Sequence, residues 1–182
     1  MPPLVRTSVL LVEDNDDHAF LFSRAFSEHP GVRLDRVCDG LEAKAYLRGR
    51  PARREGVGLS QPSALITDLN MPRCGGVELI QWLRSSEEWA GLPIVVVSSS
   101  IDQIDMDRCY AVGAQAFLIK PTTCEGFRHL VDCLVRLWQR YGVLGAPSSS
   151  AGEGCARPWS SRVNRRATAD PLQPAGRARE EA

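Results

Sequence analysis

The sequence predicts a doubly wound α/β fold, in which five parallel strands form one sheet that is covered by helices on both faces. Three observations support this prediction. Short apolar runs alternate with segments of helical periodicity between residues 7 and 141. The runs are continuously apolar, which is typical of strands buried on both faces of a parallel sheet. Polar residues follow several runs directly, at the carboxyl ends where such sheets bind ligands.

The first strand and helix are predicted at the start of this alternation. Ser8–Val12 is an apolar run that ends in an acidic stretch. Asn15 or Asp16 can cap the helix that follows. Apolar residues continue at helical spacing from His18 to Glu28, and Pro30-Gly31 prevents further extension.

Eight further elements follow in the same alternating order. Gly, Pro and Arg are concentrated over Gly49–Pro62, which predicts an exposed loop between the second helix and the third strand. The predicted elements are a weaker strand over 32–37, a helix over 41–48, a strand over 64–67, a helix over 77–85, a strand over 93–97, a helix over 102–112, a strand over 116–119 and a long helix over 123–141.

Composition limits the class of protein. Lys and Arg together number 22, as do Asp and Glu, so no global basic field attracts nucleic acid. The N-terminus does not resemble a signal peptide, the six cysteines form no CxxC pair, and no apolar run approaches the roughly 20 residues that span a membrane. We expect a cytoplasmic protein that binds neither nucleic acid nor membranes. Few large apolar residues follow Gly142, so residues 1–141 are predicted to form the domain and 142–182 a disordered tail.

Polar residues at the ends of four predicted strands form the candidate site. Glu13 and Asp14 follow the first strand, Asp68 the third, Ser98 the fourth and Lys120 the fifth. The fold would bring these strand ends together, and three neighbouring carboxylates require a cation to offset their charges. Because the ligands are all oxygen atoms, the sequence predicts Mg²⁺.

Asp68 is the candidate nucleophile, because it lies centrally and a carboxylate can form an acyl phosphate. The metal and the ammonium of Lys120 would neutralise the incoming phosphoryl oxygens. We expect Asp14 to bind the metal directly, Glu13 to bind it directly or through water, and the backbone carbonyl of Asn70 to complete the protein ligands.

Four segments carry a resemblance to the receiver domains of two-component response regulators, and the resemblance covers roughly residues 7–141. It implies a flavodoxin-like sheet with five βα units, in agreement with the fold predicted above. The segments are LLVEDN at Leu10–Asn15, LITDLNMPRCGG at Leu65–Gly76, IVVVSSS at Ile94–Ser100 and GAQAFLIKP at Gly113–Pro121.

The resemblance also implies a role for each residue of the site. Asp68 would accept a phosphoryl group from a partner histidine kinase, with Mg²⁺ bound by Glu13 and Asp14. The protein would then be a signalling receiver that assists its own phosphotransfer and dephosphorylation, and not a turnover enzyme. The remaining implied roles are the switch hydroxyl for Ser98, the phosphate-sensing amine for Lys120 and the switch aromatic for Phe117, where many relatives carry Tyr.

Two features resemble the single-domain regulators that accompany bacterial phytochrome kinases. They are the long loop Gly49–Pro62 and the string RCYAVGAQAFLIKP at Arg108–Pro121. A bacteriophytochrome is therefore the kinase that the resemblance suggests. The final helix is apolar over more of its surface than one core-facing stripe requires, so we expect a homodimer through the fourth helix, the fifth strand and the final helix.

Two other functions agree less well with the sequence. An Mg²⁺-dependent phosphatase with an Asp nucleophile is the alternative, but it would need a second Asp two positions on, where the chain has Asn70. A DNA-binding regulator would need an output domain, which residues 142–182 lack the apolar positions to build. Output is therefore expected through protein contacts. The three histidines, His18, His29 and His129, have no partner spacing and are interpreted as surface residues.

Overall fold

The computed structural model of the protein describes residues 7–49 and 61–144, and the predicted loop and tail lie mostly outside them. Strands and helices alternate throughout the described part, as predicted. The elements are β1 (Thr7–Val12), α1 (Asp16–Phe26), β2 (Val32–Val37), α2 (Gly40–Arg48), β3 (Pro62–Thr67), α3 (Gly76–Ser85), β4 (Ile94–Ser98), α4 (Gln103–Ala111), β5 (Ala116–Ile119) and α5 (Cys124–Arg140).

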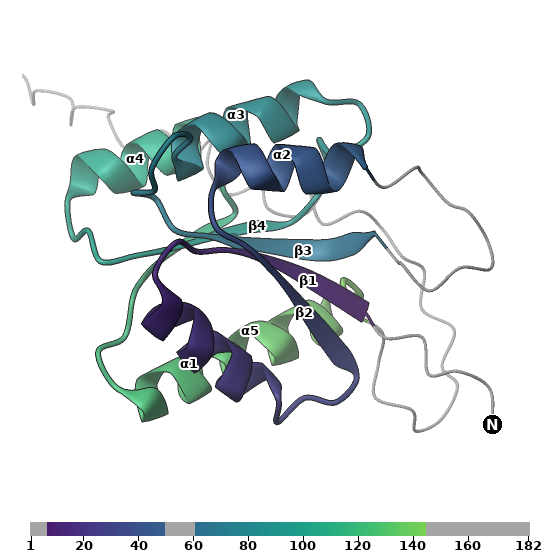
Figure 1. Ribbon diagram of the computed structural model, residues 1–182, viewed down its shortest axis with the longest axis vertical. Helices are drawn as coiled ribbons and strands as arrows, with labels where there is room; N and C mark the ends of the chain where they lie inside the picture. The colour runs from purple at the N-terminus through teal and green to yellow at the C-terminus, as the bar shows by residue number, and fades with distance from the viewer. Residues whose placement is uncertain (1–6, 50–60, 145–182) are drawn as a thin grey trace, which may run out of the picture.

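All five strands are parallel and lie in the order β2-β1-β3-β4-β5. Helices α2, α3 and α4 cover one face of the sheet, and α1 and α5 cover the other (Figure 1). This confirms the doubly wound, flavodoxin-like fold. The chain reverses its direction of winding between β1 and β3, so the carboxyl ends of these neighbouring strands form the position where such sheets bind ligands.

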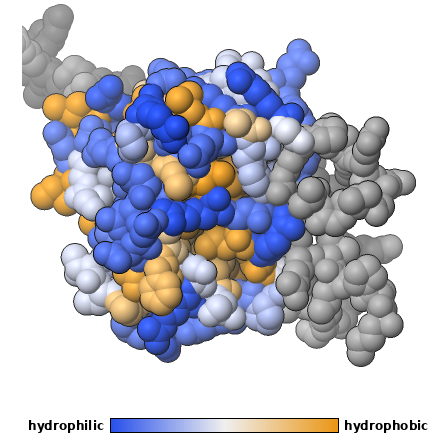
Figure 2. All heavy atoms as spheres, in the orientation of Figure 1, coloured by the Kyte–Doolittle hydropathy of each residue, from blue (hydrophilic) through white to orange (hydrophobic). Residues whose placement is uncertain are grey.

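Strand β1 is apolar in sequence because both of its faces are buried. Leu10 and Val12 point into the core beneath α2 and α3, and Val9 and Leu11 point into the core beneath α1 and α5. All four are at most 1% exposed. A strand with a helix layer on each face has no solvent side, so alternation of apolar and polar residues is absent. In Figure 2 hydrophilic residues cover most of the visible surface, and hydrophobic residues show between the two helix layers beside the edge strand β2.

The capping of α1 agrees with the sequence. The side chain of Asn15 accepts a hydrogen bond from the N–H of His18 at 2.9 Å. The helix ends at Phe26, before the predicted end at Glu28, because Glu28 and the residue after it donate to carbonyls three residues back. Such bonds tighten and end a helix. The side chains that cap α2, α4 and α5 are Asp39, Asp102 and Thr123.

The last described residues fold back onto α5. Gly142 has the left-handed φ of 70°, and the N–H of Val143 then donates to the carbonyl of Trp138 at 2.8 Å. Leu144 is 1% exposed and packs in the same apolar cluster as Trp138. The packed domain therefore includes these residues, which follow the predicted boundary at residue 141. No helix in the described part of the chain is long and apolar enough to cross a membrane.

Candidate functional site

The pairing of β1 with β3 brings three carboxylates together. Val12 pairs with Thr67 at the ends of the two strands, and the N–H of Asp68 donates to the carbonyl of Val12 at 3.0 Å. Glu13 and Asp14 therefore emerge beside Asp68. Carboxylate oxygens of these three residues lie within 4.8 Å of one another. The structure thus brings together the acidic residues that the sequence predicted to meet.

Lys120 reaches this group from the end of β5. Its Nζ donates to Oδ2 of Asp68 at 2.5 Å and to Oε2 of Glu13 at 2.9 Å. The backbone N–H of Lys120 donates to the carbonyl of Ser98 at 2.8 Å, which fixes the start of the side chain against β4. Lys120 and Glu13 are both nearly completely buried. A buried ammonium needs such charged partners, because desolvation would otherwise oppose its charge.

The carboxylate of Asp68 is held on both sides. Its Oδ1 accepts hydrogen bonds from the N–H of Leu69 at 2.6 Å and of Asn70 at 3.4 Å. Its Oδ2 faces Lys120, and the side chain is 12% exposed. The carboxylate is therefore oriented by the backbone and by one cation, yet it remains open to an incoming group. Whether the Asn70 carbonyl binds a metal remains a prediction.

The loop between β3 and α3 is shaped by close backbone contacts. Gly76 donates its N–H to the carbonyl of Leu69 at 2.9 Å, and a Cβ at Gly76 would collide with the carbonyl oxygen of Asp68. Only glycine permits this approach. Cys74 in the same loop is 1% exposed, and burial raises the pKa of its thiol. It is the small buried thiol of a packed loop.

Two further residues lie close to the site. Ser98 is the last residue of β4, and Phe117 lies within β5. The hydroxyl of Ser98 is buried and accepts a hydrogen bond from the N–H of Ser100 at 3.3 Å. Among the described residues no hydrogen bond joins it to Asp68. Phe117 is 8% exposed and packs in the cluster beneath α3 and α4. Its N–H donates to the hydroxyl of Tyr110 at 3.2 Å, which links β5 to α4.

His18 is a part of the site that the sequence interpretation missed. Its Nδ1 lies 3.2 Å from Nζ of Lys120 and 3.4 Å from Oε1 of Glu13, so its interpretation as a partnerless surface residue was wrong. Glu13 precedes the helix that carries His18, and Lys120 lies a hundred residues further along the chain, so helical spacing gave no signal. The other two histidines also have partners: His29 pairs with Asp132, and His129 contacts Cys133.

The acidic cluster fits a divalent cation. Glu13, Asp14 and Asp68 together offer only carboxylate oxygens, and Asp14 is exposed to solvent. Oxygen ligands of this kind suit Mg²⁺, which often keeps several water ligands. The side chains present could therefore hold the predicted metal. Among the described residues, the one ammonium in contact with the cluster is that of Lys120. Chemically, this arrangement can stabilise an anionic group that is transferred to a carboxylate.

Known proteins are similar to this chain in sequence and in fold. The response regulator receiver domain matches residues 9–132. The probable methanogenesis regulatory protein FilR2 of Methanothrix harundinacea is 36% identical over 142 residues, which are 77% of this chain and 88% of that protein. The phosphorylated cyanobacterial phytochrome response regulator RcpA is 27% identical with a TM-score of 0.67, over 78% of this chain and 99% of that one. The response regulator RPA3017, in red light signalling of R. palustris, is 26% identical with a TM-score of 0.63, over 79% of this chain and 99% of that one.

Proposed function

We propose, because this chain belongs to the family of response regulator receiver domains, that it signals by accepting a phosphoryl group from a histidine kinase on Asp68. Receiver domains are signalling modules that partner with histidine kinases. One observation carries the choice of Asp68. Its Oδ2 lies 2.5 Å from Nζ of Lys120, while its carboxylate also belongs to the cluster with Glu13 and Asp14. Glu13 shares both features, with its Oε2 at 2.9 Å from Nζ of Lys120, but its side chain is only 1% exposed, whereas that of Asp68 is 12% exposed and open to an incoming group.

Receiver domains bind Mg²⁺ or Mn²⁺ at an acidic pocket, and we assign this pocket to the cluster around Asp68. Asp14 is exposed and would bind Mg²⁺ directly, whereas Glu13 is buried and contacts Lys120. Asp68 and the carbonyl of Asn70 would complete the protein ligands. When bound, Mg²⁺ offsets the charge of the carboxylates and of the phosphoryl oxygens.

The chain's own residues supply the rest of the chemistry. A carboxylate oxygen of Asp68 forms a bond to phosphorus while the bond from phosphorus to the kinase histidine nitrogen breaks. The N–H of Leu69 and the ammonium of Lys120 hold the carboxylate in place before this step. The ammonium of Lys120 already lies beside Oδ2 of Asp68. It can therefore donate to an oxygen of a phosphoryl group on Asp68 without a large rearrangement.

The switch that follows involves Ser98 and Phe117. A phosphoryl group on Asp68 would attract the Ser98 hydroxyl, which within the described residues accepts a hydrogen bond from the N–H of Ser100 alone. Movement of Ser98 changes the space next to β5, where Phe117 packs beneath α3 and α4. The surface of α4 and β5 would then change, because the hydroxyl of Tyr110 on α4 accepts a hydrogen bond from the backbone N–H of Phe117.

Labelling with acetyl phosphate tests the phosphoacceptor. With Mg²⁺ present, the protein should take up one acid-stable and base-labile phosphate per chain, and Asp68→Asn should take up none. Asp102→Asn is a matched control, because Asn can still cap α4 and should be labelled normally. Stoichiometric labelling of the Asp68→Asn protein would show that the acceptor is another residue.

The alternative of an Mg²⁺-dependent phosphatase is not favoured. Asn70 stands two positions after Asp68, and its side chain cannot act as the general acid that such an enzyme needs. A generic phosphomonoester such as p-nitrophenyl phosphate distinguishes the two functions. We expect no turnover of this substrate under conditions in which acetyl phosphate labels Asp68.

The partner kinase that we propose is a bacterial phytochrome. RcpA is a phytochrome response regulator and RPA3017 acts in red light signalling, and this chain covers 99% of each of them. An autophosphorylated phytochrome kinase should transfer phosphate to the protein within minutes and should not transfer it to Asp68→Asn. If this transfer failed while acetyl phosphate still labelled Asp68, a phytochrome would be excluded as the partner kinase. The assignment of Asp68 as the phosphoacceptor would still hold.

The proposal also includes output through protein contacts, in the cytoplasm and without nucleic acid or membranes.

A homodimer would use an apolar groove of about 310 Å³ between β5 and α5. Ile119 and Leu137 protrude at this groove with 46% and 39% exposure, so two copies related by a twofold axis could each fill the groove of the other. A monomeric mass by light scattering at tens of micromolar, with and without beryllofluoride, would remove this surface from the proposal. The groove residues are Ala116, Leu118, Ile119, Leu130, Cys133, Leu134 and Leu137.

A further inference from the structure

We propose that His18 is a positioning residue, which holds the ammonium of Lys120 at the phosphorylation site by accepting its third hydrogen bond. This inference rests on the proposed function of Asp68. Nζ of Lys120 has three neighbours within hydrogen-bonding distance: Asp68 Oδ2 at 2.5 Å, Glu13 Oε2 at 2.9 Å and His18 Nδ1 at 3.2 Å. An ammonium group has three N–H donors, so these three atoms satisfy it completely.

The chemistry of the ammonium decides which role the imidazole takes. Lys120 can only donate, so the ring nitrogen that faces it must be an acceptor. A proton on Nδ1 of His18 would point toward the ammonium protons 3.2 Å away. The proton of the neutral ring is therefore placed on Nε2. Glu13 Oε1, which lies 3.4 Å from the same Nδ1, has its own donor in the N–H of Asn15 at 3.3 Å.

His18 differs from the other two acceptors because an imidazole that accepts through Nδ1 and carries its proton on Nε2 has no charge, and because helix packing sets its position. It lies in the first turn of α1, and its ring stacks on Phe127 of α5 at a centroid distance of 6.1 Å and an interplanar angle of 27°. Phe127 is buried and in turn meets the edge of Phe22 at 5.0 Å. The imidazole is thus fixed by the aromatic contact between α1 and α5.

This difference matters when the site changes charge. Phosphorylation adds negative charge at Asp68, and a bound cation competes for the oxygens of Asp68 and Glu13. Both contacts of Lys120 to carboxylates therefore change during the reaction. The contact to His18 depends on neither event, so it keeps the ammonium within reach of the phosphoryl group in each state.

Two substitutions separate the acceptor from the ring. His18→Phe retains a ring to stack on Phe127 but has no acceptor, and His18→Asn retains an acceptor near the position of Nδ1 but has no ring. With acetyl phosphate and Mg²⁺ at constant pH, we expect labelling of His18→Phe to be slower by on the order of tenfold, since one hydrogen bond to a charged group is lost. His18→Asn should label within about twofold of the unchanged protein, on the same principle.

A second experiment tests whether His18 acts through Lys120. In a Lys120→Met background, adding His18→Phe should cause no further loss of labelling rate, because the shared partner is already absent. His129→Phe, an exposed histidine on α5, is the matched control and should label normally. Thermal unfolding of each variant checks that the fold is retained.

The inference fails if His18→Phe labels at the unchanged rate, if His18→Asn is as slow as His18→Phe, or if the two losses add in the Lys120→Met background. Each of these results would assign His18 a structural role only. The proposed function is judged separately, by the loss of labelling in Asp68→Asn.

Discussion

Arg73 forms an ion pair with Asp39 that ties the loop after Asp68 to the first turn of α2. Asp39 is fully buried, and its Oδ1 accepts a hydrogen bond from the N–H of Glu42 at 2.9 Å. Its Oδ2 accepts no hydrogen bond of good geometry among the described residues, so the guanidinium is the compensation for its charge. Arg73 adopts the left-handed φ of 63°, which is uncommon for a residue with a side chain.

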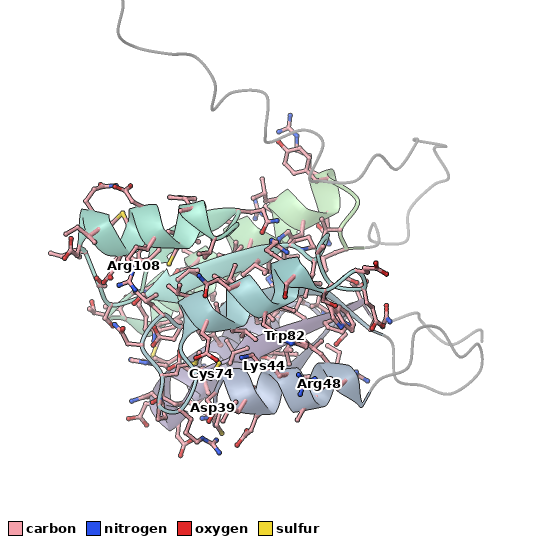
Figure 3. The ribbon with its side chains drawn as sticks, turned by 90° about the horizontal axis from the view of Figure 1, so that it is seen from above. Asp39, Lys44, Arg48, Cys74, Trp82 and Arg108 are labelled. Atoms are coloured by element: carbon pink, nitrogen blue, oxygen red, sulfur yellow. The ribbon has the colours of Figure 1, made fainter. Side chains whose placement is uncertain are left out.

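A second contact strengthens the same junction. The N–H of Gly40, next to Asp39, donates to the carbonyl of Cys74 at 3.1 Å. A Cβ at Gly40 would collide with the sulfur of Cys74, so the loop and the helix lie in direct contact. Figure 3 shows Asp39 and Cys74 near one another, with Lys44 further along α2. The loop that follows Asp68, the proposed phosphoacceptor, thus has a fixed partner on α2.

Removing the charge of Arg73 should destabilise the protein, because Asp39 would remain buried without a cation. We expect Arg73→Ala to lower the midpoint of thermal unfolding by several degrees. Asp39→Asn retains an oxygen to cap α2 and removes the buried charge. The double variant Arg73→Ala/Asp39→Asn should therefore be more stable than Arg73→Ala alone.

Arg48→Ala is the matched control for this experiment. Arg48 is the last residue of α2 and lies over the ring of Trp82 at 5.3 Å, and it pairs with no buried carboxylate in the part of the chain that the structure describes. Its removal should change the midpoint much less than the removal of Arg73. An Arg73→Ala protein as stable as Arg48→Ala would show that the ion pair does not support the buried charge of Asp39.

A cluster around Asp35 predicts how stability depends on pH. Oδ2 of Asp35 accepts hydrogen bonds from Tyr46 at 2.6 Å, Ser8 at 2.8 Å and Arg33 at 2.7 Å. Burial alone would raise the pKa of Asp35, but these hydrogen bonds outweigh it and lower the pKa below 3.8. A carboxyl with a lowered pKa stabilises the folded state above the unfolded pKa, and this contribution is lost as the pH falls through the folded pKa.

Tyr46→Phe removes one of these bonds and should lower the free energy of unfolding at pH 7 by about 1–2 kcal/mol, as for a hydrogen bond to a charged group. Urea titrations at pH 7 and at successive values down to the acid limit of folding measure this. The difference between the two proteins should hold near neutrality and shrink below about pH 3.8, where Asp35 becomes protonated. A difference that is independent of pH over this range would mean that Tyr46 contributes through packing alone.

The fold could be predicted from sequence because each strand and helix is encoded locally. The apolar run before Glu13 predicts a strand that is buried on both faces, and Asn15 or Asp16 predicts the start of the first helix, where the structure has Asn15 as the cap. The ends of helices have a weaker signal in the sequence, because backbone hydrogen bonds in the final turn decide where α1 ends, at Phe26. Patterns of side chains do not record such bonds.

The site was predictable in part for the same reason. Glu13, Asp14, Asp68 and Lys120 each follow a strand directly, so parallel topology was enough to bring them together. Contacts between distant elements carried no local signal. Arg84 is an example: its guanidinium donates to the carbonyls of Ala90 and Gly113 and to the Gln115 side chain, which only the folded chain brings near. His18 and the pair of Arg73 with Asp39 were missed for this reason.

Magnesium should stabilise the folded protein through Asp14. A ligand that binds only the folded state adds about 2.7 kcal/mol at a hundredfold excess over its Kd. We expect Mg²⁺ to raise the thermal midpoint of the unchanged protein and to leave that of Asp14→Ala unaltered. Asp16→Ala is the matched control, because Asp16 is exposed nearby and pairs with Arg36 outside the cluster. If Mg²⁺ raised the thermal midpoint of Asp14→Ala equally, the metal would be bound by other residues.

The final prediction concerns the switch that we propose between Ser98 and Phe117. Ser98 is 1% exposed and adjoins Lys120 through the backbone, whereas Ser99 is exposed. Beryllofluoride mimics the phosphoryl group on Asp68, and its binding should shift amide NMR signals across α4 and β5 in the unchanged protein. Ser99→Ala should respond in the same way, because its side chain points away from the core.

Ser98→Ala should still bind beryllofluoride, because the carboxylate of Asp68 and the ammonium of Lys120 remain in place. It lacks the hydroxyl that would move toward the phosphoryl group, so most of the shifts in α4 and β5 should disappear. Phe117 then keeps its buried position, and its N–H keeps the bond to Tyr110. Since only a few kcal/mol of differential binding set such a two-state balance, loss of one hydrogen bond is enough to prevent it. An undiminished response in Ser98→Ala would mean that the signal reaches α4 without the hydroxyl.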